Sequence, residues 1–413
     1  MHRKHMLSRL TIAAFAMFLT SCGMQDSVIV FEKQPTTDIF AADTQPVTTA
    51  ASKEQNETIF TEPETLPTSE TVPVPTGTSA MRQRLESTEV TLYDKMCEVF
   101  AQFGLEVTVT GSYDIEDIAK VYGSVLNDHP EFFWMGSGAY TSHVRGDTTT
   151  ITFDYAEGIT ESDDLPAMNR TFQQEVQTIV GQAAVAPTLY EKILFIHDYL
   201  VRSCDYDQSG ERAYTGYGCL IDHQAVCSGY TAAFQTLMHE IGVECGNVSG
   251  YTRPSWESGE GHGWNYVLFE GQYCWIDVTW DDPCMDGGTD WGDDWVSHTY
   301  FLVSSEQLFK THRLNEKECV YIPDCQTDSH SYMRMMGYFV ETYTFDAIDE
   351  LMSRGQGMIA VQFANQYDFL QACDDLIDAQ RVFDTAYMQE HDLRHYRYSK
   401  DNDNWILEIH AET

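Results

Sequence analysis

Basic residues are scarce in this sequence. Its 413 residues contain 24 Lys and Arg against 64 Asp and Glu, and the formal net charge at pH 7 is −40. A surface of this sign repels phosphate backbones, so we expect no nucleic-acid partner. The charge would suit contact with cations or basic substrates, but solubility alone is the simpler interpretation.

Two further features are missing. None of the 11 cysteines forms a CxxC pair, so we expect no structural zinc site. Apart from an N-terminal stretch, no segment is apolar for long enough to resemble a membrane span. Besides Cys22 and Cys227 the cysteine count is odd, which leaves at least one free thiol even where disulfides form. Cys319 and Cys325 are close enough in sequence to pair, although spacing alone does not decide this.

The N-terminus has the features of a signal sequence. The basic stretch MHRKHMLSRL is followed by the short apolar stretch LTIAAFAMFLT, which leads to Leu-Thr-Ser-Cys at residues 19–22. This ending resembles a bacterial lipobox, in which cleavage frees Cys22 and its sulfur receives a diacylglycerol. The resemblance implies a lipoprotein anchored to the bacterial cell membrane through Cys22 and facing the extracytoplasmic side. The alternative is an ordinary cleaved signal peptide with an incidental Cys22.

Composition and periodicity divide the chain into five parts. Residues 1–22 are the signal peptide with its lipobox. Residues 23–80 are rich in Thr, Pro, Ser and Glu and predict a disordered tether. Residues 81–160 predict an α/β segment, residues 161–325 the central core, and residues 330–413 a small α+β domain. The fold class predicted for the whole is α+β.

Individual elements follow from the spacing of apolar residues. The predicted helices lie around residues 92–103 and at 114–126, 165–183 and 188–203. The predicted strands lie at residues 131–134, 139–144, 148–155, 338–344, 358–363, 396–399 and 405–410. No internal repeat is visible.

Cys227 lies at the start of another predicted helix. Downstream of it, Tyr230, Phe234 and Leu237 fall on one helical face, and Gly242 is a natural helix stop. In the first turn of a helix, free backbone N–H groups and the helix dipole stabilise a thiolate and lower the pKa of the thiol. Position alone does not distinguish this thiol from an inert one, because many helices begin near a cysteine.

A base and a carboxylate follow in the segment GHGWNYVLFEGQYCWIDVTWDDP, which begins at residue 261. Its alternation around Glu270-Gly271 predicts a hairpin with a two-residue turn. This register places His262 and Asp277 on one face as diagonal neighbours, within reach of a hydrogen bond. A slip of one residue would place them on opposite faces.

These three side chains would form a nucleophilic triad. His262 would take the proton of the Cys227 thiol and later donate one to the leaving amine. Asp277 would hold the imidazole in the required tautomer and stabilise the imidazolium. The backbone N–H of Cys227 is available as an oxyanion donor.

The segments VCSGYTAAFQTLMHEIGV, GHGWNYV and YCWIDVTWDDP resemble the transglutaminase-like superfamily of papain-fold cysteine enzymes. The order Cys, His, Asp is the order of that family, and the match covers about residues 187–283. Upstream, EKILFIHDYLVRSCDYD and AYTGYGCL resemble the region before the cysteine in bacterial lipoproteins of this group. The resemblance implies a papain-like core in which the nucleophile helix packs on an antiparallel sheet.

The resemblance also implies roles for single residues. Cys227 is the nucleophile, His262 the general base and acid, and Asp277 the orienting carboxylate. Trp264 and Asn265 lie in the His motif of the family and support the site. Tyr217 is our candidate for completing the oxyanion hole. Family enzymes of known activity cleave or exchange amides through a thioester, whereas others have lost the triad and only bind.

The remaining histidines and acidic residues have simpler interpretations. His197, His223, His239 and His312 lack a comparable constellation, and we expect them to be structural or solvent-facing. The acidic run from Asp281 to Asp294 raises calcium as a minor possibility, but its spacing does not fit an EF-hand loop, and a solvated acidic loop is favoured. Cys, His and Asp are also an allowed zinc set, but the helix-start thiol favours covalent catalysis.

The sequence therefore predicts an extracytoplasmic cysteine enzyme without a cofactor. Its substrate would be a protein or peptide, whose amide or peptide bond is hydrolysed or transferred to an amine. The alternative is a surface binding or scaffold lipoprotein that uses the same domain without catalysis. A disulfide between Cys227 and either Cys219 or Cys204 would favour that alternative.

Overall fold

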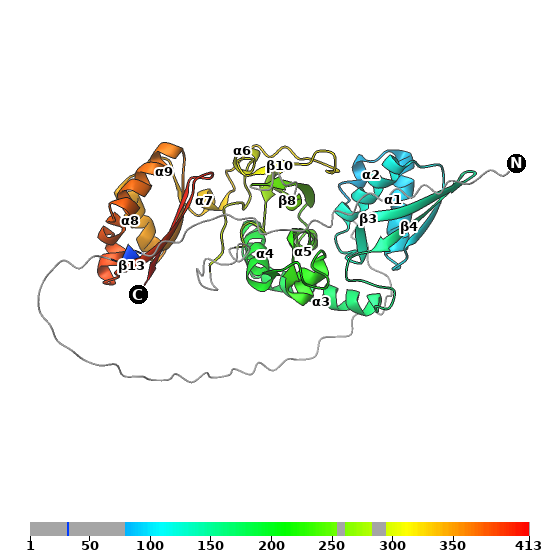
Figure 1. The fold of residues 1–413 in the computed structure, drawn as a ribbon, viewed down its shortest axis with the longest axis horizontal. Coiled ribbons are helices and arrows are strands. Elements are labelled where there is room, and N and C mark those ends of the chain that lie inside the picture. Colours follow the sequence, from blue (N-terminus) through cyan, green and yellow to red (C-terminus); the bar gives the residue numbers. More distant parts are fainter. Residues whose placement is uncertain (1–30, 33–78, 254–260, 283–294, 413) are drawn as a thin grey trace, which may run out of the picture.

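The computed structural model describes residues 31–32, 79–253, 261–282 and 295–412. The predicted lipidation at Cys22 and nearly all of the predicted tether lie outside these ranges. Within them, no helix combines the length and the apolar character that a membrane span needs. Three parts follow one another along the chain, and the central part lies between the other two (Figure 1).

The N-terminal part packs two helices beside a three-stranded antiparallel sheet of order β2-β4-β3. Its elements are α1 (Ser87–Phe100), β2 (Glu106–Thr110), α2 (Ile115–Asp128), β3 (Met135–Arg145) and β4 (Thr148–Tyr155), preceded by a 3-10 turn at Arg82–Arg84. The Asp114 side chain caps α2 by accepting a hydrogen bond from the N–H of Asp117. The predicted helix at residues 114–126 and the predicted strand pair are confirmed.

The strand predicted at residues 131–134 is wrong. This segment forms turns, in which the N–H of Phe132 donates to the carbonyl of His129, and β3 begins only at Met135. Phe132, Phe133 and Trp134 are all buried. An apolar aromatic run indicates burial, but it does not specify an extended backbone.

The central part places helices against a four-stranded antiparallel sheet of order β10-β7-β8-β9. Its helices are α3 (Leu165–Ala183), α4 (Leu189–Ser203), a π-helical turn (Gly218–Asp222), α5 (Cys227–Glu240) and α6 (Ser305–Leu308). Its strands are β7 (Cys245–Thr252), β8 (Gly261–Phe269), β9 (Gln272–Ile276) and β10 (His312–Leu314), with a separate parallel pair of β5 (Asp205–Tyr206) and β6 (Gln224–Ala225). Helix α5 packs on β7 and β8, as the predicted architecture requires.

The C-terminal part has a five-stranded sheet of order β1-β13-β14-β12-β11. Its strands are β1 (Phe31–Glu32), β11 (Phe339–Val340), β12 (Met358–Phe363), β13 (His395–Asp401) and β14 (Ile406–Glu412). Its helices are α7 (Tyr332–Met335), α8 (Phe345–Arg354), α9 (Gln366–Ala372) and α10 (Ala386–Glu390), with a π-helical turn at Cys373–Asp378 and a 3-10 turn at Arg381–Asp384. The strand at 358–363 and the β13–β14 hairpin are confirmed, whereas the strand predicted at 338–344 shrinks to two residues.

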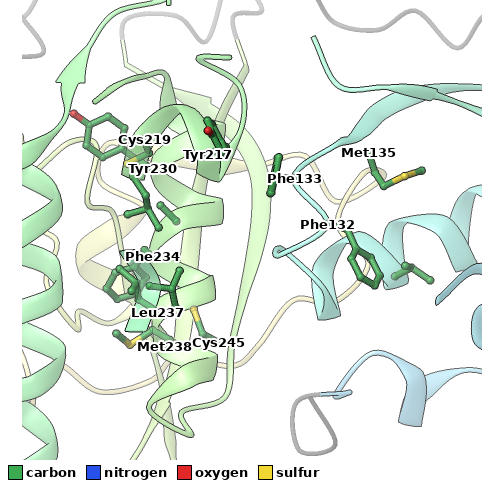
Figure 2. Close-up of a cluster of buried hydrophobic side chains, with 14 of the residues drawn as sticks. Phe132, Phe133, Met135, Tyr217, Cys219, Tyr230, Phe234, Leu237, Met238 and Cys245 are labelled. Carbon is green, nitrogen blue, oxygen red and sulfur yellow. The ribbon is translucent and has the colours of Figure 1, made fainter. Parts of the chain in front are cut away.

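One apolar cluster joins the N-terminal and central parts, and the C-terminal part has a cluster of its own. In the shared cluster, which also contains Phe132 and Met135, Phe133 lies beside Tyr217 of the segment before α5 (Figure 2). The ring centroids of Phe133 and Tyr217 are 4.9 Å apart. The helix that begins at Cys227 is therefore anchored by side chains from two parts of the chain.

Candidate active site

Cys227 is the first residue of α5. The N–H of Val226, just before it, donates to the carbonyl of Ala213 at 2.9 Å. Gly229 makes the close approach possible, because a Cβ there would lie 2.6 Å from the Ala213 oxygen. Cys227 as a whole residue is half-buried, and its backbone N–H has no partner within the helix because it lies in the first turn. The predicted helix start is confirmed.

The β8–β9 hairpin brings His262 and Asp277 together. Glu270 and Gly271 form the turn with φ of 49° and 78°, the positive values that a two-residue hairpin turn needs. Phe269 pairs with Gln272, and the register continues to the end of β9, where Asp277 follows. Nε2 of His262 lies 2.6 Å from Oδ2 of Asp277. The predicted register and the predicted hydrogen bond are confirmed.

Electrostatics favour a thiolate next to an imidazolium. Burial raises the pKa of the Cys227 thiol, but the hydrogen bond and charge of His262 outweigh it, and the net pKa is lowered. The backbone N–H of Gly263 adds a further donor to the sulfur. Burial lowers the pKa of His262, yet the charge and hydrogen bond of Asp277 raise it to about 10.

Asp277 is buried and accepts from three donors. Burial raises its pKa, but the charge of His262 and the hydrogen bonds from the two imidazoles outweigh this, and its pKa falls below the usual range. The N–H of Trp280 donates to Oδ1 at 3.1 Å. The second imidazole is His312, whose Nε2 lies 2.9 Å from Oδ2. Desolvation lowers the pKa of His312, which favours the neutral ring.

The role of His312 was missed from the sequence. It lies on the edge strand β10, which pairs with β7 so that His312 is opposite Thr252. The sequence separates it from Asp277 by 35 positions and carries no motif that links the two. A single histidine in THRL gives no periodic signal, so only the strand order identifies it.

Two predicted supporting residues adjoin the site. The Asn265 amide donates to the carbonyls of Thr231 and Gly246, each at 3.2 Å, which ties α5 to the sheet. The Trp264 ring stacks on His262 with centroids 5.9 Å apart. The Tyr217 ring packs against Phe133 in the apolar cluster (Figure 2), and its role as an oxyanion donor stays a prediction.

The acidic run begins differently from the prediction. Asp281 and Asp282 are buried, not solvated. Asp281 accepts from the N–H of Tyr300 at 3.1 Å, and Asp282 accepts from the hydroxyl of Tyr230 at 2.7 Å. The run from residue 283 to 294 lies outside the described residues.

Among the described residues, two groups of side chains are close enough together to hold a metal ion: His262, Asp277 and His312, and His197, Asp198 and His298. In the first group, an ion bound to Nε2 of His262 would replace the hydrogen bond between that nitrogen and Asp277. In the second, His197 lies 3.1 Å from Asp198 and 3.2 Å from Asp281. Burial lowers the pKa of His197, but these two carboxylates raise it to about 9. In both groups the histidines and carboxylates already satisfy one another through hydrogen bonds. We therefore assign no metal to either group.

All nine cysteines that the structure describes are free thiols. They include Cys227, Cys204 and Cys219, so the disulfide that would favour a binding role does not form here. Cys319 and Cys325 are likewise unpaired with each other.

Comparisons with known proteins agree with the sequence resemblance. Residues 177–279 match the family model of the Transglutaminase-like superfamily. The Kyphoscoliosis peptidase of Mus musculus is 24% identical over 134 residues, which cover 30% of this chain and 20% of that protein. The Kyphoscoliosis peptidase of Homo sapiens is 23% identical over 170 residues, which cover 38% of this chain and 24% of that protein.

A solved TGase structure aligns with a TM-score of 0.26 and 9% identity, over 42% of this chain and 50% of that one. The chain spans less than a quarter of the length of the two curated relatives, at 20% and 24%. The family match and the mixed helices and sheets confirm the resemblance and the predicted α+β class with a transglutaminase-like core.

Proposed function

We propose that this chain, whose residues 177–279 form a transglutaminase-like domain, is a cysteine enzyme that acts on amide or peptide bonds. One observation carries the proposal. The half-buried Cys227 at the start of α5 has its thiol pKa lowered by His262, and Nε2 of that imidazole lies 2.6 Å from a buried carboxylate. A nucleophile, a base and an orienting acid in this order are the parts that thioester chemistry requires.

The first half-reaction forms the thioester. The Cys227 thiolate attacks the carbonyl carbon, and the electron pair of the C=O bond moves to oxygen, where the backbone N–H of Cys227 can donate to it. The oxyanion then collapses, the C–N bond breaks, and His262 donates the proton on its Nδ1 to the departing amine or ammonia. Asp277 keeps the other proton of the ring on Nε2 throughout.

The second half-reaction releases the acyl group. His262, now neutral, takes a proton from water or from a primary amine as that nucleophile attacks the thioester. The C–S bond breaks, and the Cys227 thiolate and the imidazolium are regenerated. Water gives hydrolysis and an amine gives acyl transfer, so one triad can perform both reactions.

The substrate we propose is a protein or peptide outside the cytoplasm. The proposal rests on the signal-like N-terminus, where lipidation of Cys22 would hold the enzyme at the outer side of the bacterial cell membrane. The strongly acidic composition favours substrates that are not themselves acidic. Neither calcium nor another cofactor takes part in the reaction as we derive it.

The pH profile of Cys227 alkylation tests this function. Iodoacetamide labelling followed by peptide mass spectrometry gives the rate for Cys227 in the wild type and in His262→Ala. We expect Cys227 to react well below the ordinary thiol pKa of about 8.5, and to lose this reactivity in the variant. Cys319, half-buried and with a pKa raised by burial, is an internal control that should follow an ordinary or later profile in both proteins.

Two outcomes would contradict the proposal. The first is a Cys227 profile with an ordinary midpoint in the wild type, which would mean that the triad is not assembled. The second is a low midpoint that His262→Ala leaves unchanged, which would remove His262 as the base. Either result would favour a binding or scaffold role for the domain.

A further inference from the structure

A buried hydrogen-bond chain extends from Asp277 into the C-terminal part. From His312, which contacts Asp277, the chain continues through Nδ1 to Oγ1 of Thr311 at 2.8 Å. Oγ1 of Thr311 lies 3.0 Å from the hydroxyl of Tyr300. The side-chain amide of Asn404 donates to that hydroxyl at 3.1 Å. All four residues after Asp277 are buried, with exposures of at most 3%.

The acceptor-only carboxylate fixes the direction of every bond in this chain. Ionised Asp277 cannot donate, so His312 must carry its proton on Nε2. With that proton on Nε2, Nδ1 of a neutral ring has only a lone pair, and the Thr311 hydroxyl donates to it at 2.8 Å rather than to the Leu308 carbonyl at 3.3 Å. The single proton of Thr311 is then used, so Tyr300 must donate to Thr311. The Tyr300 oxygen is left to accept from Asn404, as observed.

The far end of the chain is held just as firmly. Asn404 lies in the turn between β13 and β14, and its amide nitrogen also donates to Oδ2 of Asp401 at 2.8 Å. Its backbone N–H donates to Oδ1 of the same carboxylate at 2.9 Å. The carboxylate therefore sets which way the amide points, and nitrogen is presented to Tyr300.

We propose that Thr311, Tyr300 and Asn404 act as positioning residues, through which the C-terminal part holds His312 in one tautomer and orients the Asp277 carboxylate toward His262. The inference rests on the proposed function, since it concerns the orientation of the general base. None of the three touches the Cys227 sulfur or His262. Their effect reaches the thiol only through Asp277.

Each link makes a distinct contribution. Without the Thr311 hydroxyl, His312 can move its proton to Nδ1, and the lone pair on Nε2 would then repel Asp277. Without the Tyr300 hydroxyl, Thr311 still donates to His312, but its proton is no longer directed there, because it can also donate to the carbonyl of Leu308, 3.3 Å away. The effect of removing Thr311 should therefore exceed that of removing the Tyr300 hydroxyl.

The test is the pH profile of Cys227 alkylation in Thr311→Val and Tyr300→Phe. Both changes keep the shape of the side chain and remove one hydroxyl. We expect the rate at pH 6 to fall about threefold for each unit by which the thiol pKa rises, because the weaker ionisation is partly offset by a more nucleophilic thiolate. The limiting rate at high pH, where the thiol ionises without help from His262, should rise about threefold for each such unit, because the thiolate of the weaker acid is the better nucleophile.

Matched controls separate positioning from a general loss of stability. Thr385→Val removes an equally buried hydroxyl, bonded to the carbonyl of Val382 at 2.7 Å in the C-terminal part. Arg253→Leu breaks the 2.7 Å ion pair with Asp403, which joins the central part to the same hairpin turn by another route. Both controls should show the wild-type profile even where thermal unfolding shows a loss of stability.

The outcomes distinguish this inference from the proposed function. A low midpoint of Cys227 alkylation in the wild type that rises in Thr311→Val, and rises less in Tyr300→Phe, supports the hydrogen-bond chain. A low midpoint that is the same in all variants, or that moves equally in Thr385→Val, overturns the chain and leaves the triad intact. An ordinary midpoint in the wild type overturns both.

Discussion

Replacing Asp277 with Asn should nearly abolish turnover, because the amide cannot satisfy the donors that the carboxylate satisfies. Oδ2 faces the Nε2 atoms of His262 and His312 at 2.6 and 2.9 Å, and Oδ1 faces the N–H of Trp280 at 3.1 Å. With its oxygen toward the imidazoles, Asn directs N–H at the N–H of Trp280. With its nitrogen toward them, it forces the His262 proton onto Nδ1, which then cannot accept the thiol proton.

The magnitude lies between the costs of these two orientations. A wrong tautomer in a triad of this type lowers kcat by about 10⁴, equivalent to about 5.4 kcal/mol. In the other orientation, the opposed N–H groups of the introduced Asn and of Trp280 cost about 1–3 kcal/mol, but His262 keeps the correct tautomer. A fraction of the variant molecules therefore stays competent. We therefore expect kcat to fall by about 10³. KM should hardly change, because Asp277 is 1% exposed and cannot contact a substrate.

The assay is steady-state ammonia release from carboxamide peptides that the wild type turns over. Asp128→Asn is the matched control, since Asp128 is also a buried carboxylate with three donors but lies in the N-terminal part. A loss below tenfold in Asp277→Asn would refute the assigned hydrogen bonds. So would a loss that appears in KM alone, or one that the control reproduces.

Three predictions concern stability. His197→Phe leaves the half-buried Asp198 and the buried Asp281 without their shared partner, and urea unfolding should show a loss of about 3 kcal/mol; a loss below about 1 kcal/mol would contradict the ion pairs. Gly158→Ala should lower the melting temperature by several degrees, because Gly158 has φ +78° and a Cβ would lie 1.7 Å from a carbonyl oxygen; Gly181→Ala, with nothing within 4 Å, should not. Stability should also peak near pH 6.5. The pKa is raised for His129, His197 and His262, and lowered for His239, His298, His312 and His410. The histidines with a raised pKa lose their stabilising contribution as the pH rises from about 6.5 toward 9 or 10. The histidines with a lowered pKa destabilise the fold as the pH falls below about 6.5. Melting temperatures that stay level from pH 5 to 8 would contradict this assignment.

The parts of the site that the sequence predicts are those with local signals. The start of α5 follows from helical spacing after Cys227 and a stop at Gly242. The contact between His262 and Asp277 follows from a two-residue turn and strict alternation, which together fix a register. Both signals act over fewer than twenty residues, and neither depends on the rest of the fold.

The parts that the sequence does not predict depend on tertiary packing. His312 reaches Asp277 because β10 pairs with β7, a pairing with no local signature. Tyr217 packs against Phe133 of the N-terminal part, so its place depends on how the two parts fit together. The turns at residues 131–134 carry an apolar run that suits a strand equally well, and only packing decides between the two.

Direct detection of an acylated Cys227 is the measurement that tests the account most directly. The protein is incubated with glutamine-containing peptides, quenched in acid and mapped by mass spectrometry. We predict an adduct on Cys227 with the mass of the peptide less one ammonia, absent from His262→Ala and discharged by a primary amine. Turnover that persists in Cys227→Ala, or an adduct confined to another cysteine, would contradict the assignment of Cys227 as the nucleophile.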